Sequence, residues 1–199
     1  MALFAQPSAR CGRCALPVLP GMRQCAACKS KPPQIDAALA AVTYGFPWAK
    51  MVHDFKFHET PAWARSMASL MRSTPWVDPA LDNADWVLPM PLSKERMLQR
   101  GFNQAFLLAR ELAPRSISKD LLLRIQDTPA QSSLPRRERL ANVQHAFAVE
   151  PLQRHLLQGK RIVLVDDVMT SGASINAAAQ TLKQAGAQHV TALVFARTD

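Results

Sequence analysis

Several classes of protein are excluded by what this sequence of 199 residues lacks. No stretch reaches the roughly 18 consecutive apolar residues that a transmembrane helix needs, and residues 1–10 lack the apolar run of a secretory signal. Neither G-x-x-x-x-G-K-[ST] nor G-x-G-x-x-G occurs among the seven glycines, so two common phosphate-binding fingerprints are missing. Internal repeats are absent as well. We therefore expect a cytoplasmic protein without a membrane-inserted segment.

Acidic residues are scarce, with 15 Asp and Glu against 24 Lys and Arg, which gives a net charge of +9. Residues 93–139 supply ten of the basic and five of the acidic residues, and therefore +5 of that total. An excess of positive charge favours polyanions such as nucleic acid or phosphorylated metabolites, although a basic solvated surface would show the same balance. The 48% of hydrophobic residues is enough for a packed core.

Cysteine is confined to the first 28 residues, where Cys11-x₂-Cys14 and Cys25-x₂-Cys28 are separated by ten residues. Two such knuckles can direct four thiolates at one ion, which predicts a closed, structural zinc-ribbon-like site. Residues 1–33 are too few for a core of their own, and zinc would supply roughly 10–16 kcal/mol of folding free energy. Two disulfides, or a redox or iron–sulfur role, are the alternatives.

Residues 34–199 alternate predicted strands with predicted helices, which indicates a second, α/β domain with a parallel sheet. The predicted strands cover residues 38–44, 86–88, 121–125, 162–165 and 190–195. Helices are expected from Thr60-Pro61, from Gln104 after an Asn103 cap, and over residues 175–182 with Gly186 beyond the end. Residues 126–144 are polar and Arg-rich, which predicts a long loop.

The segment of residues 162–174 carries the most specific pattern, an apolar strand followed by two acids, a hydroxyl-rich turn and a helix. Free N–H groups at a helix start suit a phosphate, and glycine allows close approach of the backbone. The carboxylates of Asp166 and Asp167 would accept hydrogen bonds from ribose hydroxyls, with Mg²⁺ offsetting their charge. The phosphate would lie on the turn that follows, formed by Thr170, Ser171, Gly172, Ala173 and Ser174. An acidic turn of another α/β protein, such as a metal-binding response regulator, is the alternative.

This 13-residue pattern closely resembles the phosphoribosyl-diphosphate (PRPP) signature of type I phosphoribosyltransferases. The resemblance implies that family's fold, a parallel sheet with flanking helices and a small hood. Thr170 stands where hypoxanthine-type members carry an acidic general base, so the resemblance does not extend to their purine chemistry.

A basic stretch before the predicted helix at Gln104 contains Lys94, Arg96 and Arg100. Arginine forks bind phosphate oxygens in a bidentate way, so these residues are candidates for holding the diphosphate in a turn-rich segment. An ordinary basic surface turn would look the same. Further along, the long loop offers Gln131, Arg136 and Arg139 as candidates for a mobile loop that closes over the site, and a disordered basic loop is the alternative.

The order of motifs along the whole chain resembles one family in particular, the ComF family. Its motifs here are Arg-Gly-Phe-Asn-Gln at residues 100–104, Thr128 with Gln131, Arg139 with Asn142, Lys56 before an aromatic residue, the Asp-Asp loop and the cysteine module. The resemblance implies a PRPP-binding protein linked to natural competence and uptake of single-stranded DNA, with that DNA and a competence helicase as candidate partners. Some members of this family are tied to sugar-acid utilisation instead.

Two other functions stay open at this stage. One is an active phosphoribosyltransferase on an unidentified base or amine, for which no residue that positions an acceptor can be named. The other is a DNA-binding module with a degenerate enzyme fold, which rests on the net charge and on the predicted zinc site. Release of diphosphate would identify the first, and a steep loss of DNA affinity with salt would identify the second.

Overall fold

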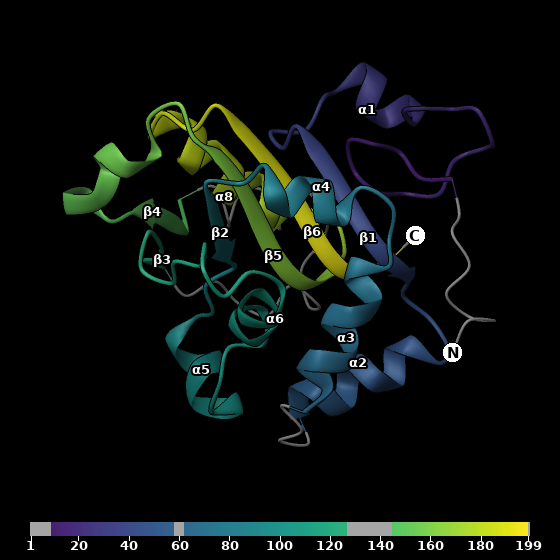
Figure 1. The fold of residues 1–199 in the computed structure, drawn as a ribbon, viewed down its shortest axis with the longest axis horizontal. Helices are drawn as coiled ribbons and strands as arrows, with labels where there is room; N and C mark the ends of the chain where they lie inside the picture. The colour runs from purple at the N-terminus through teal and green to yellow at the C-terminus, as the bar shows by residue number, and fades with distance from the viewer. Residues whose placement is uncertain (1–8, 58–61, 127–144, 199) are drawn as a thin grey trace.

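A four-stranded parallel sheet forms the centre of the protein (Figure 1). The computed structural model describes residues 9–57, 62–126 and 145–198. The strand order is β1-β6-β5-β2, with bounds of Ala37–Thr43 for β1, Trp86–Pro89 for β2, Arg161–Met169 for β5 and His189–Arg197 for β6. All three neighbouring pairs are parallel, which confirms the predicted α/β architecture.

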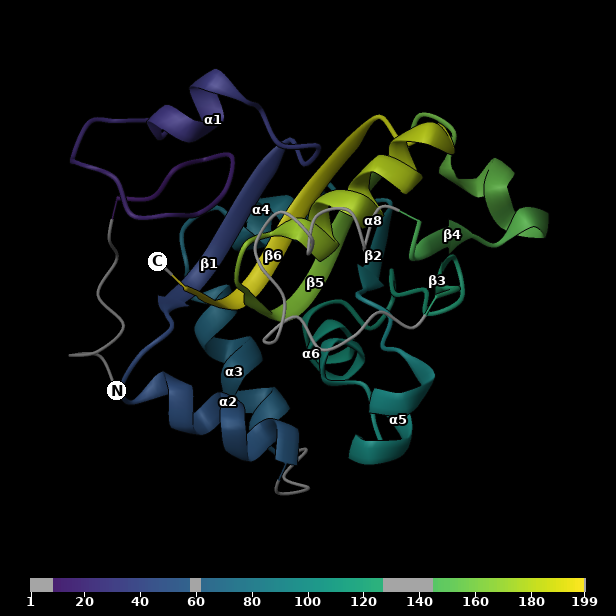
Figure 2. The same ribbon diagram turned by 180° about the vertical axis from the view of Figure 1, so that it is seen from behind.

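The two faces of the sheet are covered by different elements, because successive residues of a strand point in opposite directions. In β5, Val163 and Val165 pack toward one group of helices, and Ile162 and Leu164 pack toward the other face. The first face is covered by α2 (Trp48–Phe57), α3 (Trp63–Arg72), α4 (Val77–Asp82) and α6 (Gln104–Leu112). Helix α8 (Ala173–Gln184) covers the second face, as Figure 2 shows from behind. None of the helices in the described part of the chain is both long and apolar enough to span a membrane.

Local capping signals explain where two of the helices begin and end. The Asn103 side chain accepts a hydrogen bond from the Phe106 N–H at 3.2 Å, which confirms the predicted cap of α6. Gly186 lies just beyond α8 with a φ of +106°, the left-handed conformation typical of a glycine after a helix, which confirms the predicted helix end. The predicted start at Thr60-Pro61 lies outside the described residues, within which α3 begins at Trp63 after Ala62, without a side-chain capping bond.

Helix α5 (Lys94–Arg100) replaces the turn-rich segment that the sequence predicts. The Ser93 hydroxyl caps it by accepting from the Arg96 N–H at 3.3 Å, and Gly101 ends it with a φ of +72°. None of its seven residues is buried, so the sequence has no apolar stripe that would reveal it.

A smaller antiparallel sheet lies outside the main sheet and pairs β3 (Leu122–Arg124) with β4 (Phe147–Val149). The strand predicted at residues 121–125 is thereby confirmed. A 3-10 helix, η2 (Pro151–Leu157), leads from β4 toward β5. The candidate loop and motif residues of this region all lie outside the described residues: Thr128, Gln131, Arg136, Arg139 and Asn142.

The N-terminal cysteine module packs directly against the main sheet. Its short helix α1 (Ala26–Ser30) carries the buried Cys28. The Ala38 N–H of edge strand β1 donates to the Gly12 carbonyl at 2.9 Å, and Ala15 is fully buried in the core on the α8 face. Packing of this kind fixes the module relative to the sheet.

The capping role of Asn103 predicts a moderate loss of stability when its side chain is removed. Asn103 also donates from Nδ2 to the Met90 carbonyl at 3.0 Å, so it joins α6 to the end of β2. We expect Asn103→Ala to lower the free energy of unfolding by about 1–2 kcal/mol in chemical denaturation. Asn83→Ala, which removes an exposed side-chain bond to Pro79 at the end of α4, is the control and should cost less than about 0.5 kcal/mol. Equal losses in the two variants would contradict the capping role.

Candidate functional site

A cavity of about 560 Å³ opens at the carboxyl end of the parallel sheet. Its wall combines the end of β5, the start of α8, the residues after β2, and side chains from α2 and α5. In open α/β sheets this edge is where ligands bind, because the loops after the strands and the helix N-termini meet there. The sequence-predicted phosphate loop therefore lies in the wall of this cavity.

Strand β5 carries both acids of the predicted site, since it continues four residues beyond the predicted end at Val165. Asp167 is 5% exposed and Asp166 is half-buried. The Asp167 N–H donates to Asp166 Oδ1 at 2.9 Å. Lys56 Nζ, from α2, lies 3.0 Å from Asp167 Oδ2 and forms an ion pair with it. Two carboxylates and one ammonium group are thus held together at the end of a buried strand.

The close approach of the two acids changes the pKa of Asp166. Burial raises the pKa of Asp166 to about 7, the charge of Asp167 adds to this, and the Lys56 ammonium partly opposes it. Asp166 therefore gains or loses its proton near neutral pH, and a cation or a set of hydroxyl donors beside it would favour the ionised form. Groups of this kind cluster at functional sites.

The turn after β5 leads directly into the N-terminus of α8. Gly172 has a φ of +75°, a left-handed conformation that favours glycine, and an added Cβ would lie 3.3 Å from Asn176 Nδ2. Ser171 Oγ accepts from the Ala173 N–H at 3.3 Å, so its side chain supports the turn, and Ser171 is not among the described residues that line the cavity. The other predicted phosphate-binding residues do line it: Thr170, Gly172, Ala173 and Ser174.

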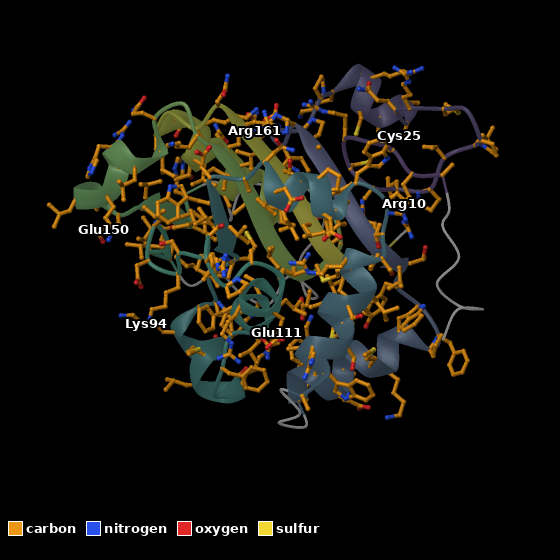
Figure 3. The ribbon with its side chains drawn as sticks, in the orientation of Figure 1. Arg10, Cys25, Lys94, Glu111, Glu150 and Arg161 are labelled. Carbon is orange, nitrogen blue, oxygen red and sulfur yellow. The ribbon has the colours of Figure 1, made fainter. Side chains whose placement is uncertain are left out.

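Helix α5 brings two of the three predicted diphosphate ligands to the cavity, Arg96 and Arg100. Lys94 lies at the start of the same helix and points away from the sheet in Figure 3, outside the cavity wall. Arg100 Nη1 donates to Gln104 Oε1 at 3.0 Å, and its guanidinium stacks 5.3 Å from the centre of the Phe57 ring. Burial lowers the pKa of Arg100, and the charge of Asp167 opposes this, but an arginine stays protonated in proteins.

Two further residues of the wall carry no signal in the sequence. Arg124, from β3, lies over the Phe147 ring at 5.6 Å, and Tyr44 follows β1. Together with Lys56, Arg96 and Arg100, Arg124 gives the described part of the wall four basic side chains against two acidic ones, hence a charge of 4 − 2 = +2 with both acids ionised. A cavity with this balance suits a ligand with several negative charges.

The four cysteines form a second site in the N-terminal module. Their Sγ atoms all lie within 4.8 Å of one another, and Cys14 Sγ is 3.7 Å from Cys25 Sγ, too far for a disulfide. A tetrahedral zinc with Zn–S bonds of about 2.3 Å requires sulfur atoms about 3.8 Å apart. All four are free thiols in the structure, and the cluster could hold a metal ion.

Backbone groups around the cluster act on its thiols in different ways. Burial raises the pKa of Cys28 and of Cys14. At Cys11 burial also acts to raise the pKa, but hydrogen bonds from the backbone of Cys25, Arg13 and Cys14 outweigh it and lower the pKa to about 7. Backbone N–H groups directed at a sulfur stabilise the thiolate, which is the form that binds metal.

Comparison with known proteins places the geometry in a family. Residues 100–198 match the phosphoribosyl transferase domain. The chain is 32% identical over 200 residues to the DNA utilization protein YhgH of Salmonella typhimurium strain LT2, which covers 94% of this chain and 84% of that protein. It is 26% identical over 196 residues to competence protein F of Haemophilus influenzae, with the same two coverages. Competence protein ComFC of Bacillus subtilis is 38% identical over 100 residues, covering 50% of this chain and 39% of that protein.

The matched domain contains Arg100, the last residue of α5, together with the end of β5, the turn after it and all of α8, and these supply most of the cavity wall. The match to YhgH also extends over most of the chain. The chain therefore belongs to the family of competence protein F and DNA utilization protein YhgH, the ComF family, whose members carry a phosphoribosyl transferase-like domain.

Proposed function

We propose that the cavity binds PRPP, or a related ribose 5-phosphate ligand, together with Mg²⁺. The observation that carries the proposal is the juxtaposition of two acids, a helix N-terminus and several basic side chains around one cavity of about 560 Å³. PRPP has a sugar flanked by a monophosphate and a diphosphate, so it needs acceptors in the middle and cationic or N–H donors on both sides. The wall contains groups of each of these kinds.

Each part of the ligand has a counterpart in the wall. The 5-phosphate is assigned to the turn at residues 170–174, at the N-terminus of α8, where the helix dipole favours an anion. The ribose hydroxyls would donate to the carboxylates of Asp166 and Asp167. Arg96 and Arg100 are the candidates for the diphosphate, with Lys94 as an outer candidate on the same helix.

Mg²⁺ fits the chemistry of the acids in the wall. It prefers oxygen ligands and commonly bridges one or two carboxylates to phosphates of the bound ligand. Asp166 and Asp167 supply carboxylate oxygens on adjacent residues, beside the proposed position of the diphosphate. The ion would add positive charge next to Asp166 and thereby favour the ionised form of this residue.

The names of the relatives support a role in the use of DNA. The matched proteins are called competence protein F, competence protein ComFC and DNA utilization protein YhgH. We infer that this chain also acts in the handling of DNA, with single-stranded DNA and a competence helicase as candidate partners. The net charge of +9 is compatible with a nucleic-acid partner.

The cysteine cluster is proposed to hold zinc as a structural ion. The sulfur separations match a tetrahedral site, and none of the four positions is left for water or substrate. Cys11 and Cys28 are buried, which fits a closed site. Zinc here would link the turn that carries Cys11 and Cys14 to helix α1.

Removal of the acids should abolish ligand binding while leaving the fold intact. We expect the double variant Asp166→Ala, Asp167→Ala to lower the affinity for PRPP in the presence of Mg²⁺ by at least about 100-fold, measured by calorimetry. The matched control is Asp78→Ala, which removes an exposed carboxylate that pairs with Arg72 away from the cavity. Unchanged affinity in the double variant would refute the assignment of the acids to the ribose, and lack of binding by the unmodified protein would refute the proposal as a whole.

The raised pKa of Asp166 predicts a pH-dependent cost to stability. Because its folded-state pKa of about 7 exceeds the value of about 3.9 in an unfolded chain, the unfolded chain loses this proton first, so stability falls as pH rises from about 4 to about 7 and levels off above that. Asp166→Asn cannot ionise, so the ligand-free variant should gain stability over the unmodified protein, by about 1–2 kcal/mol at pH 5 and about 3–4 kcal/mol at pH 8. Denaturation at several pH values measures this, and a difference that does not change with pH would show that Asp166 titrates normally.

Loss of one cysteine should release the metal. We expect Cys11→Ser and Cys25→Ser to reduce the zinc content, measured by elemental analysis, from about one ion per chain to nearly none. Thermal unfolding should begin at lower temperature in both variants. Iron or two disulfides in the purified protein would instead favour the alternatives for this module.

A further inference from the structure

Arg197, at the end of β6, joins the cysteine module to the phosphate loop. It is 5% exposed. Its Nε donates to the Cys14 carbonyl at 2.9 Å, and its Nη1 donates to the Met169 carbonyl at 3.1 Å and to the Thr170 carbonyl. One buried guanidinium therefore holds the backbone of a metal-site cysteine and the backbone of the turn that lines the cavity.

A second connection runs through Asn176 in the first turn of α8. Its Nδ2 donates to the Gly172 carbonyl at 2.9 Å, and its Oδ1 accepts from the Gln34 N–H at 2.7 Å. Gln34 directly follows Pro33, whose carbonyl accepts from Arg13 in the Cys11–Cys14 turn at 3.1 Å. The left-handed Gly172 is thus tied to the module from the other side of the turn.

Both connections join the cysteine module to the turn after β5, although Arg197 comes from β6 and Asn176 from α8. Figure 2 shows the C-terminal end of β6 beside β1 and the N-terminal module, with α8 on the same side of the sheet. Arg197 fixes the beginning of the turn at residues 169–170, and Asn176 fixes its end at residue 172. Cys14 supplies both a thiol to the metal cluster and the carbonyl that Arg197 binds.

We propose that Arg197 and Asn176 are positioning residues that make the phosphate loop depend on the metal state of the cysteine cluster. The metal fixes the Cys11–Cys14 turn, the turn fixes the acceptor for Arg197 and the chain before Gln34, and these contacts hold residues 169–172 in shape. Metal loss then loosens the loop and weakens ligand binding, a consequence that rests on the proposed PRPP function. The effect on the loop itself does not require that function.

Amide hydrogen exchange of the full chain tests the coupling without any ligand. We expect removal of zinc by a chelator to speed exchange at residues 168–177 by about tenfold in the unmodified protein, the effect of losing one charge-assisted hydrogen bond. In Arg197→Met and in Asn176→Ala the loop should exchange rapidly even with zinc bound, and chelation should add less than about twofold. All proteins are first shown to carry equal zinc.

A matched control is available at the far end of α8. Arg154 Nη2 donates to the Gln184 carbonyl at 2.8 Å, so Arg154→Met also removes an arginine-to-carbonyl bond on this helix but does not touch the module. It should retain the full response of the loop to chelation. Asn176→Ala decides the question if Arg197→Met fails to fold, because alanine is well tolerated in a helix.

Two results would overturn the proposal. One is a loop whose exchange stays unchanged on chelation while the module at residues 11–28 exchanges faster. The other is full zinc sensitivity in Asn176→Ala and in any folded Arg197→Met protein. A PRPP titration of the zinc-loaded and stripped protein completes the test, with at least a fivefold loss of affinity expected on stripping. If the zinc-loaded protein binds no PRPP, the proposed function fails, while the exchange data still decide the coupling.

Discussion

The pair of carboxylates at the end of β5 is the constraint on which the site depends. Strand β5 is buried on both faces, so its last residues cannot turn their charges freely into water. Lys56 Nζ neutralises Asp167 from 3.0 Å away from its Oδ2. The pKa of Asp166 is raised by burial and by the charge of Asp167. Lys56 comes from α2 and Arg100 from α5, so helices from two distant parts of the chain are needed to balance two consecutive residues of one strand.

The parts of the fold that the sequence predicts are those with a strong local cause. An uninterrupted apolar run before Asp166 is expected of a strand covered on both faces, and a capping Asn103 or a glycine at residue 186 marks a helix end by its own backbone chemistry. The Asp-Asp turn combines several such causes in 13 residues. That is why it identified the edge of the sheet where the cavity lies.

Residues that matter through distant contacts could not be predicted in this way. Arg197 is one of 24 basic residues, and nothing near it in the sequence shows that it contacts Cys14, which is 183 positions away. Helix α5 was missed because none of its residues is buried, and its pattern therefore resembles a basic turn. Lys56 belongs to the motifs that resemble the family, but neither its place in the cavity wall nor its ion pair with Asp167 was predicted, because both depend on how α2 packs on the sheet.

The cysteine module packs against the edge strand β1 of the main sheet. Strand β1 is an edge of the main sheet, and an open edge exposes backbone groups that can pair with other chains. The Gly12 carbonyl accepts from Ala38 on that edge, and the buried Ala15, held at a φ of +57°, places part of the module in the core. A non-glycine residue keeps such a conformation only where its surroundings enforce it. The contacts that protect the edge and those that reach the phosphate loop through Arg197 start from the same turn, so an ion that stabilises this turn acts on both.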